Sequence, residues 1–484
     1  MTTTAPHPST PQAGDTALRG RLGPVSITFM VIAAAAPLTV VGGLVPVGIL
    51  LGNGIGFPIM FIVAAAILLL FSVGLMALNR HVPGTGTFSS YVAVGLGPRA
   101  GAAAAGLALV CYSGVQAAVF SYLGATLSSS IAALGGPELH WTLFTIASIA
   151  LVGILGYRHI ELSSKVLFVV LAAEIGIVLV LGVVVIATGG AEGLDGSPFL
   201  LSHILSGSPA LGLMFALAGF IGFESTVVYR SEARDPDRTI PRATYGSAIL
   251  VGLFYAFGTW VLIMAAGPSA IVAEAGADPS GLLTTLTARY LGPLGEIVVA
   301  VLFLGSMFAA VLSLHNVISR YQHSMAHRGL APRGLGAVHP VHGSPHRSAL
   351  VQVATAAILI LLANGAGITA DMMFSWGAGI GSVAIAILMA ITCVSVIVAF
   401  RRAPGRTTLW QRLIAPGLGA LGLLIGAVLI VANFPLLVGD ARPDGTPTWG
   451  PVSITLLVII AAAPLIAWLL SLTRPLPAER GISE

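Results

Sequence analysis

The stretch from Pro24 to Asn79 contains no Asp, Glu, Lys, Arg or His, and this feature constrains the fold of the chain more than any other. A helix that crosses the hydrocarbon core of a bilayer needs about 20 apolar residues. The stretch is therefore long enough for two crossings, separated by the turn Gly52-Asn53-Gly54. Only 8% of the 484 residues are charged, against about 25% in soluble domains. The composition excludes a soluble enzyme and a disordered protein alike.

Similar apolar stretches recur along the chain and predict an all-α polytopic membrane protein with twelve spans, and thus with both ends on one side. We expect residues 1–22 and 475–484 to be tails, the first one disordered, and residues 23–474 to form the membrane domain. The predicted spans are residues 24–50, 57–79, 101–130, 141–157, 166–187, 207–229, 244–266, 291–318, 348–364, 374–399, 413–437 and 450–473.

The basic residues support this assignment independently of hydropathy. Of the 22 Lys and Arg residues, 20 lie in the tails or in the loops on the same side as the tails, and only Arg289 and Arg442 lie in the opposite loops. Basic residues accumulate on the cytoplasmic side of membrane proteins. We therefore expect a multi-pass protein of the cytoplasmic membrane with both termini in the cytoplasm.

Two spans contain residues that disfavour a continuous helix. The first has Pro37 and the pair Gly42-Gly43, and the sixth has Gly219 and Gly222 followed by Glu224. Proline removes a backbone donor, and glycine weakens a helix. Non-helical backbone is tolerated at membrane depth only where it faces protein or a watery cavity. We predict that helices 1 and 6 are discontinuous, although a simple kink at Pro37 and close packing at the glycines are the alternatives.

The two predicted breaks lie in the first spans of two consecutive sets of five. Sets with an odd number of spans have opposite orientations in the membrane, so the pattern predicts a five-plus-five inverted repeat. Interrupted helices at matching positions of two halves indicate the substrate site of a transporter. The first repeat covers residues 24–187, the second covers residues 207–399, and two extra helices follow within residues 413–473.

Several motifs in both halves resemble those of the amino acid–polyamine–organocation permeases. They are Arg80–Gly86 with the following Gly95–Pro98, Gly219–Glu224 with the following Ser231–Pro236 and Ile240–Ala243, and Met325–Pro332. The resemblance implies a secondary active transporter that imports amino acids or related amines by alternating access, with the proton as coupling ion. It implies no catalytic residues and no resident metal or cofactor. The expected partners are the substrate and the lipid bilayer, with no nucleic acid and no obligate protein partner.

The resemblance also places the substrate at the two breaks. Its carboxylate is expected at the free N–H groups and positive dipole end of one half-helix, and its ammonium at the carbonyl end of the other. Pro37 and Thr39 depart from the glycine-rich pattern of the family, which leaves the register in span 1 open. The expected contacts are Thr39, Val40, Val41, Gly42 and Gly43 for the carboxylate, and Ala218, Gly219, Phe220 and Ile221 for the ammonium.

Further side chains are candidates for the pocket wall. Phe220 either covers the substrate as an aromatic lid or packs between helices. Tyr112 and Gln116 lie four residues apart on one face of span 3, and Trp376 lies in span 10. Each of these side chains either lines the pocket or bonds to a neighbouring helix.

Glu174 is the only ionisable residue of span 5, and a charge at this depth is costly unless it faces a cavity or a cation. We expect it to take up the coupling proton or to attract a cation or basic substrate, the alternative being a structural, protonated carboxyl. Glu224 is a second proton or gating candidate, and its alternative role is to cap N–H groups after the second break. Ser306 and Ser313 share one face of span 8 and are candidates for a sodium site, the less favoured coupling ion.

Rival functions differ in mechanism or substrate. An exchanger or a polyamine uptake permease would use the same fold, and a membrane receptor that senses the substrate without carrying it is the alternative outside transport. Histidines cluster between His323 and His346, but no acid or cysteine accompanies them in this segment, so we expect no metal site. No arrangement of nucleophile and base at membrane depth indicates an enzyme.

Overall fold

The computed structural model describes residues 23–81, 86–158, 164–403, 405, 407–440, 442, 444 and 446–473. The predicted tails at 1–22 and 475–484 and part of the motif Arg80–Gly86 lie outside these residues. The described part consists of helices and contains no strand. Eleven described helices are long and apolar enough to cross a membrane, and the shorter apolar helix Trp141–Tyr157 matches the remaining predicted span. The prediction of an all-helical polytopic membrane protein is thus confirmed.

The first and sixth spans are discontinuous, and the other spans are continuous or bent helices. Span 1 comprises α1 (Pro24–Ala34), α2 (Pro37–Thr39), the π-helical turn η1 (Val40–Leu44) and α3 (Val45–Leu51), and span 6 comprises α10 (Pro209–Gly219) and the 3-10 segment η4 (Phe223–Glu232). The others are α4 (Phe57–Asn79), α6 (Pro98–Ala133), α7 (Trp141–Tyr157), α8 (Ser164–Thr188), α11 (Pro236–Ala266), α13 (Leu282–His327), α14 (His346–Gly365), α15 (Ala370–Arg402), α16 (Ala415–Ala432) and α18 (Pro451–Leu472).

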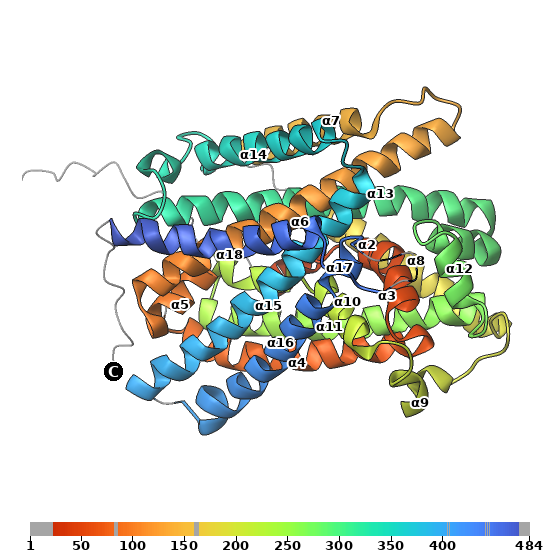
Figure 1. The fold of residues 1–484 in the computed structure, drawn as a ribbon, viewed down its shortest axis with the longest axis horizontal. Coiled ribbons are helices and arrows are strands. Elements are labelled where there is room, and N and C mark those ends of the chain that lie inside the picture. The colour runs from red at the N-terminus through yellow and green to blue at the C-terminus, as the bar shows by residue number, and fades with distance from the viewer. Residues whose placement is uncertain are drawn as a thin grey trace, which may run out of the picture.

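Short helices lie at the two ends of the bundle. Figure 1 shows the long helices running roughly from left to right, with α5 (Phe88–Leu96) at the left end and α9 (Leu201–Ile204) and α12 (Ile271–Ala277) at the right end. The α5 helix is fixed to α15, because Ser395 Oγ donates to Tyr91 O (2.7 Å) and accepts from Gly95 N–H (3.1 Å). Arg328 and Arg402 reach this left end, since they donate to Ser89 Oγ (2.7 Å) and Gly95 O (3.1 Å) of α5.

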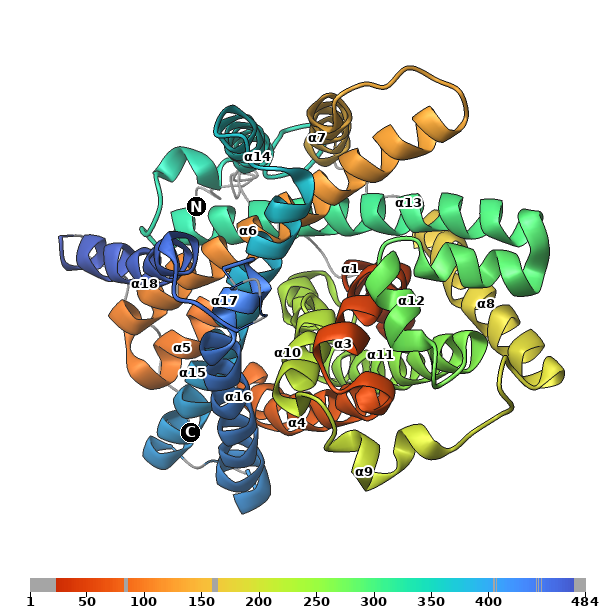
Figure 2. The ribbon, with the colours of Figure 1, turned by 45° about the vertical axis from the view of Figure 1, so that its right-hand side comes forward.

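Small residues allow the spans to pack closely, as membrane helices require. A Cβ atom on Gly377 of α15 would lie 2.3 Å from Gly114 O of α6, and one on Gly252 of α11 would lie 2.7 Å from Ala65 Cβ of α4. Figure 2 looks into the bundle and shows α3 and α10 side by side near its centre. The two discontinuous spans therefore meet inside the molecule.

Candidate functional site

The break in span 1 is centred on Ala36. Ala36 has φ 46° and ψ 69° and is the only described non-glycine residue with positive φ. Pro37 follows it and begins α2, and a proline disfavours the right-handed helical conformation in the residue before it. The carbonyl of Ala35 accepts a hydrogen bond from Tyr255 Oη of α11 (2.9 Å). The predicted discontinuity of helix 1 is thus confirmed, and it is tied to span 7.

The break in span 6 depends on Gly222. The helix α10 ends at Gly219, Gly222 adopts φ 109° and ψ −21°, and the chain continues as the 3-10 segment η4. Only glycine adopts such a φ without steric strain. Ser225 Oγ donates to Gly222 O (2.6 Å), so a carbonyl released by the break has a partner. The prediction of a discontinuous helix 6 is confirmed.

The two breaks border a cavity of about 80 Å³. One buried water needs roughly 15 Å³ on the same measure, so the cavity has room for a small molecule. Among the residues predicted to contact substrate, five line it. The full lining is Ala35, Ala36, Thr39, Val40, Leu44, Val115, Ala118, Val119, Ala218, Gly219, Ile221, Ala310, Leu314, Phe374 and Ala378.

Thr39 contributes the only polar side chain of this lining. Its Oγ1 atom is buried and has no hydrogen-bond partner. An unpaired buried hydroxyl costs about 1–3 kcal/mol, so a polar ligand or water in the cavity would stabilise the protein here. The remaining polar capacity comes from backbone groups that the two breaks release.

Three further residues of span 1 that we expect to contact the substrate carboxylate, Val41, Gly42 and Gly43, do not line the cavity. A Cβ on Gly42 would lie 2.9 Å from Leu283 and 3.1 Å from Phe303, and one on Gly43 would lie 3.6 Å from the Tyr122 ring. Val41 packs against Gly258 of α11. Val41, Gly42 and Gly43 lie in the π-helical turn η1 and face neighbouring helices. The predicted contact at these three residues therefore does not involve this cavity.

Four predicted side chains also lie outside the lining and have partners in the protein. Phe220 packs against Phe61 and Tyr255, with ring centroids 6.5 and 5.8 Å apart, which matches its packing alternative. The polar groups of the other three are hydrogen-bonded: Tyr112 Oη to Glu224 Oε1 (2.8 Å), Gln116 Nε2 to Val311 O (3.0 Å), and Trp376 Nε1 to Val438 O (3.0 Å).

The lining residues that sequence reasoning missed are apolar. They include three pairs spaced by four residues, one on each of α6, α13 and α15: Val115 with Val119, Ala310 with Leu314, and Phe374 with Ala378. Residues four apart share a helix face. Apolar residues occupy every face of these helices, so the spacing alone does not distinguish the face toward the cavity.

Glu174 lies beside the break in span 1 and not in the cavity. Its carboxyl, 2% exposed, lies near the backbone N–H of Leu38 at the start of α2 and near the side chain of Ser306 on α13. Glu174 Oε2 and Ser306 Oγ nevertheless have no partner within ordinary hydrogen-bond geometry. Of the two serines predicted for span 8, the structure brings Ser306 and not Ser313 to this carboxyl.

Glu224 closes the break in span 6. Its Oε2 accepts the Gly222 N–H at 2.9 Å, and its Oε1 accepts the Tyr112 hydroxyl at 2.8 Å. The hydrogen bond to the Gly222 N–H corresponds to the capping alternative that the sequence leaves open for Glu224. Each break thus has one buried carboxyl beside it. Glu174 of span 5 lies at the break in span 1, and Glu224 of span 6 lies at the break in its own span.

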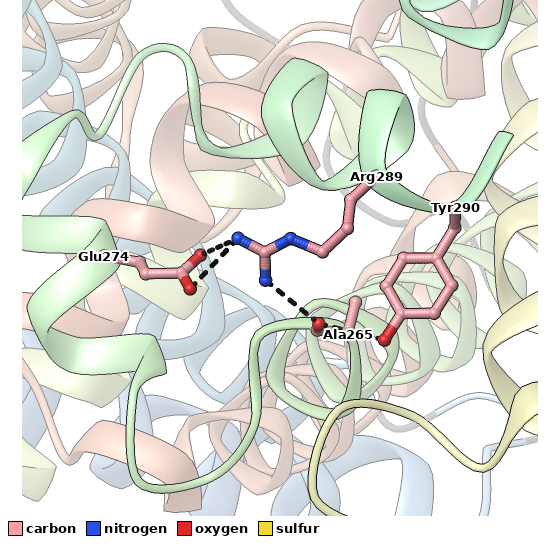
Figure 3. Close-up of polar contacts among 4 residues, drawn as sticks. All are labelled: Ala265, Glu274, Arg289 and Tyr290. Carbon is pink, nitrogen blue, oxygen red and sulfur yellow. Dashed lines mark hydrogen bonds and ion pairs between the residues drawn. The ribbon is translucent and has the colours of Figure 1, made fainter. Parts of the chain in front are cut away.

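A polar clamp covers the end of the bundle next to α3. Arg289 of α13 pairs with both Glu274 oxygens of α12 at 3.2 Å and reaches Ala265 O at the end of α11 (3.5 Å), which also accepts from Tyr290 Oη (3.1 Å), as Figure 3 shows. The helix α12 in turn packs on α3. The clamp therefore connects spans 7 and 8 with the outer half of span 1.

A twelve-span bundle with broken first and sixth helices around a buried cavity defines a protein of the membrane-transporter class. Comparison with known proteins agrees: residues 22–463 match the family described as amino acid permease. The chain belongs to this family, which confirms the resemblance found in the motifs.

Relatives share parts of the chain. It is 32% identical over 191 residues to an uncharacterised transporter of Mycobacterium tuberculosis, covering 39% of this chain and 42% of that protein. It is 33% identical over 126 residues to a branched-chain amino acid permease of Lactococcus lactis, 26% of either chain. It is 28% identical over 191 residues to a cadaverine/lysine antiporter of Escherichia coli, covering 38% and 41%. The chain thus spans less than half the length of these relatives, whose names are those of transporters and not of enzymes.

Proposed function

We propose that this protein is a secondary active transporter that imports neutral amino acids with small apolar side chains, coupled to protons, by alternating access. The observation that carries the proposal is the cavity between the two breaks, whose lining is apolar except for Thr39. A diamine or a lysine substrate would carry a second cationic group into the cavity, and the lining has no acidic side chain to pair with it. A charge left unpaired in such a place is costly.

The breaks supply complementary poles for an amino acid. The α2 helix starts beside the cavity with N–H groups that lack intrahelical partners. The α10 helix ends there with the Gly219 carbonyl, whereas the neighbouring Leu217 O and Ala218 O already accept the N–H groups of Phe220 and Ile221. The substrate carboxylate would bind at the start of α2, where it also accepts a hydrogen bond from Thr39 Oγ1. The substrate ammonium would donate to the backbone carbonyls near Gly219. The side chain would point toward Val115, Phe374 and their apolar neighbours.

Glu174 is our candidate for the coupling proton. It lies near Leu38 on span 1 and near Ser306 on span 8 at the same time. Protonation removes the charge that attracts the Leu38 N–H, so proton uptake would loosen span 1 from span 8. Movement of the half-helix that binds the substrate would thus depend on the proton.

The decisive measurement is uptake of radiolabelled alanine, valine, lysine and cadaverine into proteoliposomes, with and without an inward proton gradient. We expect uptake of alanine and valine that the gradient stimulates and that lysine and cadaverine do not compete with. Uptake that requires preloaded substrate would indicate an exchanger, cadaverine uptake would indicate a polyamine permease, and binding without uptake would indicate a receptor.

Glu174→Gln tests the coupling in the same system. The amide keeps the shape of the carboxyl but cannot release a proton. We expect uptake by this variant to lose its stimulation by the gradient while downhill exchange continues. Glu224→Gln is the matched control, because Glu224 is equally buried but is held by two hydrogen bonds at the other break. Retained stimulation in Glu174→Gln would remove Glu174 from the mechanism.

A further inference from the structure

A second pocket, of about 270 Å³, lies between the end of α15 and the start of the helix that leads into α16. Figure 1 shows these two segments converging at the lower left, at the same end of the bundle as α5. Its walls combine apolar side chains with two arginines: Ile397, Phe400, Arg401, Leu409, Arg412 and Leu413. None of these residues lines the cavity between the breaks.

Local capping defines one wall of this pocket. The Thr408 N–H donates to Gln411 Oε1 (3.2 Å), and the Gln411 N–H donates to Thr408 Oγ1 (3.3 Å). This reciprocal pattern is a capping box, which fixes the start of a helix. The π-helical turn η6 (Trp410–Ile414) follows and places Arg412 opposite the end of α15.

The two arginines of the pocket have no partner within the described chain. Neither Arg401 nor Arg412 forms a hydrogen bond or an ion pair with a described residue, although the adjacent Arg402 donates to Gly95 O (3.1 Å) and Arg230 pairs with Asp237 (3.1 Å). Two guanidinium groups thus line one hollow without an internal anion. Guanidinium groups bind phosphate oxygens well because they present several donors in one plane.

The position of the pocket along α15 corresponds to the headgroup level of a bilayer. The helix has 33 residues and is about 50 Å long at 1.5 Å per residue, longer than the hydrocarbon core of about 30 Å. Its last residues, Arg401 and Arg402, therefore lie beyond that core. Next to them Leu409, Trp410 and Leu413 are 52%, 47% and 40% exposed, as expected for side chains that face lipid and not water.

We propose that this pocket binds an anionic phospholipid from the bilayer. The lipid phosphate contacts Arg401 and Arg412, and one acyl chain lies along Phe400, Leu409 and Leu413. A zwitterionic lipid offers the same phosphate but adds a cation that the two arginines repel. The site therefore selects lipids with net negative charge, and it holds α15 and α16 together at this end of the bundle.

Native mass spectrometry of the purified full chain tests this proposal. The protein is titrated with phosphatidylglycerol, with phosphatidylcholine and with inorganic phosphate. We expect phosphatidylglycerol to bind at least 10-fold more tightly than phosphatidylcholine. Since each basic residue contributes about 1 kcal/mol to anionic lipid binding, the double variant Arg401→Gln/Arg412→Gln should bind phosphatidylglycerol about 10- to 30-fold more weakly.

Two comparisons keep the result interpretable. Arg333→Gln/Arg347→Gln removes the same charge from two exposed arginines on the same side of the bundle and should leave binding unchanged. Arg401→Lys/Arg412→Lys keeps the charge and should restore most of the binding, which separates loss of the site from loss of the fold. Equal weakening by both glutamine variants, equal binding of the two lipids, or phosphate binding without lipid binding would overturn the proposal.

Discussion

Thr39 has a buried hydroxyl without a hydrogen-bond partner, as Ser306 and Ser319 also have, but of these three residues Thr39 alone lines the cavity between the breaks. Its Oγ1 lies at the wall of the cavity between the breaks and has no hydrogen bond. Since native proteins satisfy nearly all buried polar groups, a hydroxyl left unpaired in a transporter indicates a ligand that completes it. The substrate carboxylate fits this role, because it accepts hydrogen bonds and is expected at the start of α2.

Thr39→Val tests this role, since it keeps the shape and removes the hydroxyl. A hydrogen bond to a charged group contributes about 1.5–3 kcal/mol, so we expect the KM for alanine uptake to rise at least 10-fold. Thermal stability should stay the same or rise slightly, because an unpaired buried hydroxyl is removed. Both quantities are measured on the same preparation, by proteoliposome uptake and by thermal unfolding in detergent.

Thr259→Val is the matched control for Thr39→Val. Thr259 is also buried in a span, but its hydroxyl donates to Tyr255 O one turn earlier (2.7 Å) and does not line the cavity. Its KM for alanine should not change. An unchanged KM in both variants would show that Thr39 does not contact the substrate.

Sequence reasoning identified Thr39 and the backbone at Ala218 and Gly219 because proline, glycine and hydroxyl residues stand out in an apolar helix. It did not identify Val115, Ala310 or Phe374, which look like any other residue of an apolar span. Conversely, Tyr112 and Gln116 stood out as polar residues, but their side chains bond to Glu224 and Val311. Polarity marks residues that need a partner, and the fold decides whether that partner is protein or ligand.

At the level of elements, the two breaks arise by different means. Ala36, next to Pro37, adopts the left-handed region at φ 46°, whereas at the second break Gly222 adopts φ 109°. The first break stores strain in an alanine, and the second avoids strain by using glycine. The second break should therefore be the more sensitive to substitution by a residue with a Cβ.

Gly222→Ala tests this difference. An L-residue at such a φ costs about 1–2 kcal/mol, so we expect a Tm lower by a few degrees and reduced uptake, because the carbonyls near Gly219 would shift. Gly246→Ala is the control, since Gly246 lies inside α11 with no atom within 4 Å of the added Cβ. That change should leave the Tm unchanged or raise it. Equal Tm values for the two variants would contradict a strained position at Gly222.

The ends of the elements were predicted less well than their number. We predicted span 8 at residues 291–318. The kink of α13 (Leu282–His327) at Gly292, where φ is 71°, agrees with the predicted start, but the helix continues past residue 318 to His327. Span 7 begins at Pro236 and not at residue 244. Hydropathy detects only the part of a helix within the hydrocarbon core, whereas backbone hydrogen bonding continues into the polar segments beyond it.

At the level of the whole molecule, the charge distribution and the fold describe the same orientation. The tails and connections that carry 20 of the 22 basic residues are predicted to lie on one side of the membrane. The pocket with Arg401 and Arg412 lies at one end of the bundle, and the clamp of Glu274 and Arg289 lies at the other. From the positive-inside rule we expect the first end to be cytoplasmic, and the proposed import would then run from the clamp toward that end.

Cysteine labelling in cells tests this orientation. Both native cysteines, Cys111 and Cys393, are free and buried, so they give little background. Ser280→Cys places a thiol on the exposed loop after α12, and Val341→Cys places one on the loop before α14, where Val341 is 81% exposed. A membrane-impermeant maleimide added to intact cells should label Ser280→Cys and not Val341→Cys, and permeabilised cells should show both.

The opposite labelling pattern would have a specific meaning. If only Val341→Cys reacts in intact cells, the fold and the cavity are unaffected, but the end of the bundle with Arg401 and Arg412 faces the outside of the cell. The proposed direction of transport would then be reversed. The anionic lipid would then belong to the outer leaflet. If both variants react in intact cells, α13 does not separate Ser280 from Val341 across the bilayer, which would contradict the twelve-span topology itself. Orientation and topology are thus tested separately by one pair of variants.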